Sequence, residues 1–146
     1  MKISAKLRYA VRTLVELGRQ PGGVISLAEV ERRQQISAKF AKQILQPLEE
    51  KNLVGSKRGA AGGYFLLRPP KEIRLLDVMQ ALGENPKLVP CLASSYECSR
   101  EKTCGARGVW EDLGNRIEEY FTATTIQDII TLEDDGKSGS WREGPL

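Results

Sequence analysis

The feature that most limits the fold of this chain is a glycine-rich turn between two short strand-like segments. Residues 53–58 and 64–68 are strand-like, and Gly59-Ala60-Ala61-Gly62-Gly63 joins them. This spacing predicts a β-hairpin with a tip that carries few side chains. Pro69 and Pro70 close the hairpin. The fold class then depends on the segments that precede the hairpin.

Three helical patterns precede the hairpin. Apolar residues recur at spacings of three and four in the first pattern, and glycine and proline end it. Ser26, with Glu29 three residues on, is a capping-box pattern that starts the second helix. Helices are therefore predicted over residues 4–19 and 26–34, from Ser37 onward, and over 74–83. Three helices followed by a two-stranded wing is the order of a winged helix-turn-helix.

The second half of the chain has a different pattern. Residues 84–105 lack periodicity and contain all three cysteines. Apolar and aromatic residues then step by three and four, at Trp110, Leu113, Ile117, Tyr120 and Thr124. This is a heptad seam about two repeats long, too short to be stable alone, so it must pack against another helix of this chain or of a partner. A short last helix over 125–132 and a disordered tail from Glu133 are predicted.

Charge separates the two halves of the chain. Residues 1–70 hold 13 Lys and Arg against 5 Asp and Glu, whereas residues 71–146 hold 9 against 14. A strongly basic half indicates a polyanionic partner, most commonly nucleic acid. The chain has no histidine, which excludes Ser-His-Asp and Cys-His catalysis and histidine metal sites. It also has no membrane-length apolar run and no signal-peptide pattern, so a cytosolic location is predicted.

The predicted third helix and the wing carry the candidate DNA contacts. A helix that begins at Ser37 directs Lys39, Lys42 and Gln43 toward a major groove, where lysine reaches guanine and glutamine bonds adenine. Lys57 and Arg58 precede the glycine turn, and a thin basic tip suits the narrow minor groove. The alternative is a protein-binding winged helix with a solvated basic face.

The cysteines follow the spacing Cys91-x6-Cys98-x5-Cys104. Their odd number and cytosolic setting disfavour a disulfide framework, and closely spaced thiols on an aperiodic loop suggest a metal. Zinc would need a fourth ligand, such as a carboxylate, because histidine is absent. An iron–sulfur cluster is held by thiolates and can take another group at the fourth position. Three thiols without a metal remain the alternative.

Three stretches together carry a family resemblance. They are the opening Met1 to Val11, the segment from Ile36 to Leu48, and Leu53 to Tyr64 with its Arg-Gly-x-x-Gly-Gly-Tyr wing. They resemble the Rrf2 family of winged-helix transcription regulators, the group of the IscR and NsrR iron–sulfur and nitric-oxide sensors. The resemblance covers residues 1–130. The cysteine triplet followed by a long helix also matches the members that bind a cluster.

The resemblance implies roles for individual residues. Arg58 matches the wing arginine that enters the minor groove, and Tyr9 matches a first-helix aromatic near the DNA backbone. The recognition-helix positions that meet phosphates and bases fall on Ser37, Lys39, Lys42 and Gln43. Cluster ligands fall on Cys91, Cys98 and Cys104. The long helix matches the dimerisation helix, which implies a two-fold interface of Trp110, Leu113, Ile117 and Tyr120.

The chain departs from the family at the fourth cluster ligand. Arg107 stands where IscR-like members have histidine, and Arg8 stands where NsrR-like members have aspartate. The recognition helix also has Ala41-Lys42 where IscR-like members have Leu-Glu, so the operator can differ. The fourth ligand would have to come from a carboxylate, another oxygen donor, solvent or a small thiol, with Glu97 and Glu101 as local candidates. Since oxygen ligands exchange readily, an oxygen-sensitive [4Fe–4S] cluster is favoured over [2Fe–2S].

These expectations define one reading of the chain. The fold class is mainly α with a small β-wing, a winged helix-turn-helix domain plus a long C-terminal dimerisation helix. The predicted divisions are a DNA-binding domain over 1–83, a cluster loop over 84–105, a dimerisation helix with a short helix over 106–132, and a tail over 133–146. The function is a homodimeric regulator of a palindromic double-stranded DNA operator, controlled by an iron–sulfur cluster. The alternative is a regulator or adaptor that uses its cysteines as thiol sensors or for structural zinc. No base–nucleophile set or nucleotide loop points to an enzyme.

Overall fold

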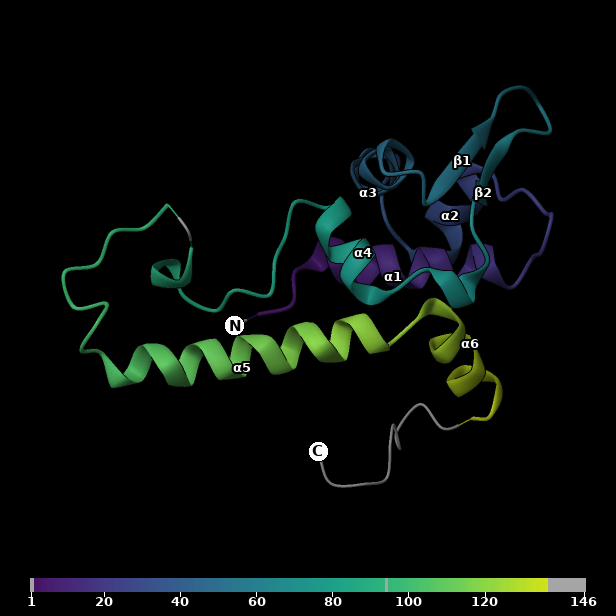
Figure 1. Ribbon diagram of the computed structural model, residues 1–146. Helices are drawn as coiled ribbons and strands as arrows, with labels where there is room; N and C mark the ends of the chain where they lie inside the picture. The colour runs from purple at the N-terminus through teal and green to yellow at the C-terminus, as the bar shows by residue number, and fades with distance from the viewer. Residues whose placement is uncertain (1, 94, 137–146) are drawn as a thin grey trace.

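A computed structural model describes residues 2–93 and 95–136 (Figure 1). The order of elements is three helices, a two-stranded hairpin, and three further helices, with two short 3₁₀ turns (η1 and η2) between them. Their bounds are α1 Ala5–Gly18, α2 Leu27–Gln34, α3 Ala38–Glu50, β1 Val54–Lys57, β2 Gly63–Leu66, η1 Pro70–Glu72, α4 Leu75–Ala81, η2 Pro90–Leu92, α5 Gly105–Ala123 and α6 Ile126–Asp134. This confirms the predicted winged helix-turn-helix.

Serine side chains cap the first three helices, as their positions in the sequence predict. The hydroxyl oxygens of Ser4, Ser26 and Ser37 each accept a hydrogen bond from the backbone N–H three residues on. Each cap satisfies an N–H that the helix leaves without a partner. Between α2 and α3, Gln35 adopts the left-handed conformation with φ 53°, which makes the turn tight. The turn fixes α3 at an angle to α2.

The hydrophobic core is built around α1. This helix buries Leu7, Ala10, Leu14, Val15 and Leu17. Helices α3, α4 and α6 and the hairpin pack around it, and they contribute buried residues that include Ile44, Leu48, Val54, Ile73, Val78, Ile126 and Ile130. Because α1 contacts both α3 and the hairpin, it sets their relative position.

The hairpin is anchored to the body of the domain by a third backbone segment. Its two strands pair antiparallel, with Val54 opposite Leu66 and Lys57 opposite Gly63. Ile25, just before α2, forms a bridge with Tyr64, in which each backbone N–H donates to the other residue's carbonyl oxygen at 2.9 and 2.8 Å. The wing is therefore held along β2 up to the last strand pairs before the turn, while its tip stays exposed.

Gly63 is required beside the bridge of Ile25 with Tyr64, and its replacement by alanine is expected to destabilise the domain. A Cβ at Gly63 would lie 2.3 Å from the carbonyl oxygen of Ile25, a backbone atom that cannot move aside freely. Gly63→Ala should lower the free energy of unfolding by about 1–3 kcal/mol, measured by urea denaturation. The matched control is Gly108→Ala in α5, where a Cβ meets nothing within 4 Å. The control should leave stability equal or slightly raised, since alanine favours helix. Equal melting of both variants would contradict the predicted clash.

Helix α5 differs from all the other helices in how little of it is covered. It has 19 residues, and none of them is buried. Figure 1 shows α5 projecting from the domain, with its N-terminal end far from the wing. The segment that follows α5 pairs in the core with the segment that leads into α4. Arg74 forms a bridge with Thr125, with the Leu75 N–H bonded to the Thr124 oxygen and the Ile126 N–H bonded to the Ile73 oxygen, both at 2.9 Å.

The last helix is longer than the sequence pattern predicts, and it packs elsewhere. Disorder was expected from Glu133, but α6 runs to Asp134, and Arg19 at the end of α1 pairs with both Glu133 and Asp134. These ion pairs explain the two additional helical residues. Ile126 and Ile130 of α6 join the core around α1, so α6 packs with the DNA-binding elements. Residues 137–146 of the predicted tail lie outside the described residues.

Candidate DNA interface and cysteine loop

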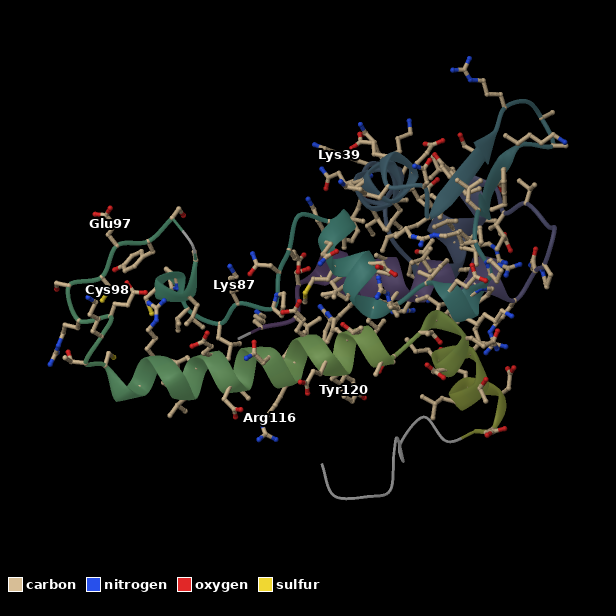
Figure 2. All side chains as sticks on the ribbon, in the orientation of Figure 1. Lys39, Lys87, Glu97, Cys98, Arg116 and Tyr120 are labelled. Carbon is tan, nitrogen blue, oxygen red and sulfur yellow. The ribbon has the colours of Figure 1, made fainter. Side chains whose placement is uncertain are left out.

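The outer face of α3 presents the residues predicted to read DNA. Ala41, Ile44, Leu45 and Leu48 are buried on its inner side, whereas Lys39, Lys42 and Gln43 are exposed. Figure 2 shows Lys39 on the outer side of the helix. Neither lysine is in an ion pair with another described residue. Both ammonium groups are therefore free for phosphate or base contacts.

The wing extends this exposed basic surface. Lys57 ends β1, and Arg58 starts the turn, and both are exposed. The hairpin stands beside α3 and projects on the same side of the domain (Figure 1). Ser56 in β1 donates a hydrogen bond to Glu49 near the end of α3, which ties the wing to the helix. The five residues predicted on these two elements are thus presented together.

The arginines of α2 are neutralised within the protein. Glu29 accepts hydrogen bonds from Arg32 and from Arg33, and Arg33 also pairs with Glu16 at 2.9 Å between Nη1 and Oε2. The bonds from Arg32 and then Arg33 lower the pKa of Glu29 to about 2. The carboxylate therefore stays charged at neutral pH. The positive charge that no carboxylate compensates therefore lies on α3 and the wing, not on α2.

Tyr9 has a structural role that the sequence pattern did not reveal, whereas Ser37 caps α3 as predicted. Tyr9 is half-buried under the first turn of α3, where its ring packs edge-on against Phe40 at 5.7 Å between centroids. The guanidinium of Arg12 lies 5.2 Å from the centre of the Tyr9 ring. Ser37 uses its oxygen to accept from Phe40 N and keeps its O–H free to donate. Arg12 was not predicted as a neighbour of Tyr9, because only the contact with the ring in the structure identifies it.

The cysteine loop lies at the opposite end of α5 from Tyr120 (Figure 2). Cys91 lies in η2 and is half-buried, like Cys98, whereas Cys104 is exposed as the N-cap of α5. All three are free thiols. No three or more described Cys, Asp or Glu side chains come together in a group that could hold a metal ion. The three predicted ligands are on one loop, but they are not gathered.

Arg107 and Glu101 occupy the surroundings of these thiols. A hollow in the loop is lined by Tyr96, Cys98 and Arg107, among others. Glu101, predicted as a possible fourth ligand, pairs with Arg107 at 2.9 Å between Oε1 and Nη2. Glu97 is exposed on the loop. Three thiols are a donor set that suits an iron–sulfur cluster. For all three to bind it, the sulfurs must come closer together than they lie in this structure.

The predicted seam on α5 is exposed and leads into an apolar groove. Trp110 and Leu113 are 41% and 42% exposed, and Ile117 and Tyr120 are half-buried. Near the C-terminal end of α5, the surface forms a groove with α1 and α4 that is lined by Ile3, Leu7, Arg8, Val11, Arg12, Leu75, Tyr120 and Phe121. The opposite side of α5, with Glu111 and Glu118, lies against the segment from Pro86 to Leu92. The side with Glu111 and Glu118 thus faces its own chain, whereas Trp110 and Leu113 of the seam, and the paired Asp112 and Arg116 (Figure 2), face outward.

Comparison with known proteins adds independent information. The Rrf2 family, described as an iron-dependent transcriptional regulator, matches residues 3–132. The transcriptional regulator IscR of Cereibacter sphaeroides is 36% identical over 139 residues, covering 91% of this chain and 89% of that protein. The structure of T. potens IscR has a TM-score of 0.72 and 28% identity, over 99% of this chain and 94% of that one. The structure of CymR, the global cysteine regulator of B. subtilis, has a TM-score of 0.73 and 29% identity, over 90% and 97%.

A last observation concerns the length and composition of the helices. Within residues 2–93 and 95–136, no helix has both the length and the apolar composition needed to cross a bilayer.

Proposed function

This chain belongs to the Rrf2 family of DNA-binding transcription regulators, and from that premise we propose that it is a homodimer that binds a palindromic operator under the control of an iron–sulfur cluster. Its relatives are regulators rather than enzymes. A protein that binds the chromosome acts where the DNA is, which agrees with the cytoplasmic location predicted from the sequence.

The exposed basic surface of α3 and the wing is the observation that carries the DNA-binding part. Its four cations are Lys39, Lys42, Lys57 and Arg58. In the proposed complex, α3 enters the major groove, where lysine and glutamine side chains reach base edges. The glycine-rich tip brings Arg58 into the adjacent minor groove, where the negative potential is strong.

Arg58→Ala is expected to weaken operator binding without loss of fold, because Arg58 is exposed and contributes no core area. Removing one arginine from each subunit should flatten the plot of log affinity against log salt by up to ~2 units of slope. Fluorescence anisotropy across a salt series measures both quantities. Arg68→Ala, which removes a cation just after the end of β2 at the base of the hairpin, away from the tip, is the matched control. An unchanged affinity and slope for Arg58→Ala would remove this residue from the interface.

The three thiols carry the cluster part of the proposal. Cys91, Cys98 and Cys104 would hold the cluster, and when bound it supplies iron–thiolate bonds and redox sensitivity. The chain's own contribution is the path from the loop to the DNA surface. Glu84, where the loop begins, accepts a hydrogen bond from Ser4, and Ser4 caps α1.

The path continues along α1. Tyr9 of α1 packs against Phe40 in the first turn of α3. A change in the loop that shifts Glu84 would therefore act on the element that supports α3. Regulation by this route is a shift between two arrangements with different affinity for the operator.

The apolar surface of α5 supports the homodimer. A 19-residue helix with no buried residue, about 28 Å long, leaves apolar area exposed that a partner is expected to cover. The seam runs into the groove of α1, where Arg8 and Arg12 stand beside apolar side chains. A second copy fits this surface, because its own acidic α5 would meet the two arginines, and a two-fold axis lets each copy offer the same patch.

The test of the cluster proposal is anaerobic purification followed by an absorbance spectrum and a count of iron and sulfide. A brown protein with about four irons and four sulfides per chain is expected for [4Fe–4S]. Operator affinity is then compared before and after oxygen removes the cluster, and a measurable change supports control by the cluster.

A second candidate is a thiol-based regulator of the same fold. The ungathered thiols favour it, together with the likeness to a protein described as a global cysteine regulator. A colourless protein after anaerobic reconstitution, whose operator affinity changes on thiol oxidation, would establish this candidate and overturn the cluster.

A further inference from the structure

Arg107 connects parts of the cysteine loop that are far apart in the sequence. It is the third residue of α5, and its side chain is 23% exposed. Its Nη1 donates to the backbone oxygen of Cys91 at 2.6 Å, and its Nη2 pairs with Oε1 of Glu101 at 2.9 Å. One guanidinium therefore joins η2, the segment before Cys104, and the start of α5.

The rest of the loop is held only locally. Every other hydrogen bond made by its described residues, 85–93 and 95–104, joins groups no more than three residues apart. The bond from Arg107 to Cys91 spans 16 residues. Local turns do not bring Cys91 toward Cys104, whereas this bond does. Arg107 thus supplies the hydrogen bond and ion pair that tie the loop to the start of α5, beside the packing of Pro86 and Leu92 near this helix.

We propose that Arg107 is a positioning residue that holds the cysteine loop against α5 in the metal-free protein and so shortens the movement by which the three thiols gather around the cluster. This inference rests on the proposed function. Arginine is suited to the role because its planar fork donates in two directions at once, which lysine cannot do. Charge-assisted hydrogen bonds are also stronger than neutral ones.

Closure of the loop lowers the entropy that cluster binding must remove. A loop that is already folded loses less conformational freedom when its thiols bind iron. Arg107 also explains why Glu101 is a poor fourth ligand: the carboxylate that could reach iron is already paired. Arg107 thus supports the three thiol ligands and keeps Glu101 from acting as the fourth, so another donor must take that position.

The first test is hydrogen–deuterium exchange on reduced, metal-free protein. Arg107→Ala and Arg107→Lys are expected to speed amide exchange in peptides covering 89–93 and 97–103 by about tenfold or more, given the strength of hydrogen bonds to charged groups. Arg100→Ala is the matched control, since Arg100 is an exposed arginine of the same loop. Exchange in α1 and α3 and the melting temperature should stay unchanged. Equal exchange in wild type and both Arg107 variants would overturn the proposal.

The second test separates this inference from the proposed function. In chelator challenge of the reconstituted protein, Arg107→Ala should lose iron several-fold faster than wild type and Arg100→Ala. Faster exchange in the variants, together with a wild type that takes up no iron, would refute the cluster and leave the loop-closing role standing. Normal iron retention by Arg107→Ala would instead refute the preparation of the thiols, while leaving the cluster intact.

Discussion

Replacing Leu113 and Ile117 together with glutamate is expected to convert the dimer into monomers. Both side chains lie on the outward seam of α5, and a two-fold interface would bring four carboxylates together in an apolar contact. Sedimentation velocity should show the monomer mass. Affinity for the palindromic operator should fall by about 10²–10⁴, because two linked half-site contacts become two independent ones.

The fold of the variant should survive, since no residue of α5 is buried in the single chain. The matched control is Gln80→Glu with Gln127→Glu, which adds the same charge at exposed positions of α4 and α6. The control should remain a dimer with full operator affinity. A dimer that persists in the Leu113 and Ile117 variant would place the interface elsewhere.

Replacing any one of Cys91, Cys98 or Cys104 by alanine is expected to abolish stable cluster binding. Two thiolates with exchangeable oxygen donors cannot retain iron that three thiolates hold, because thiolate is the ligand that selects such clusters. Iron and sulfide per chain after anaerobic reconstitution should fall from full occupancy to near zero. Operator affinity should then equal that of the cluster-free wild type.

Ser99→Ala is the control for these variants, since it removes a polar group beside Cys98 on the same loop. It should load like wild type, and Glu97→Gln should at most alter the rate at which the cluster decays. A cysteine variant that keeps a full cluster would exclude that cysteine as a ligand.

Local features of this fold could be predicted because their signals lie within a few residues. Serine caps predict the starts of α2 and α3, and the glycine turn predicts the wing. Even here a neighbour can change the outcome. Glu29 was expected to complete a capping box with Ser26, but its carboxylate binds Arg32 and Arg33 instead. Two guanidinium groups three and four residues on are stronger partners than a backbone N–H.

Contacts between distant segments could not be predicted, because periodicity carries no information about which segments meet. The bridge of Ile25 with Tyr64 and the pairing of Arg19 with Glu133 join residues that no local pattern relates. Arg107 shows the same limit at the candidate site. The sequence shows only that Arg107 stands where IscR-like members have histidine, whereas the structure shows that it contacts both Cys91 and Glu101 across the loop.

The bridge between Arg74 and Thr125 has a consequence for how such regulators diversify. It joins the start of α4 to the start of α6, so α4, the cysteine loop and α5 form one segment whose two ends pair in the core. The entropy of closing such a segment changes slowly with its length, by about 0.6 kcal/mol for each doubling. The part of the segment that follows α4, the cysteine loop and α5, adds no residue of α5 to the core, so it can be shortened, extended or given other ligands with little effect on the folding of the winged domain. The same winged domain can therefore carry sensor segments of different length and unrelated ligand chemistry, in evolution or in design.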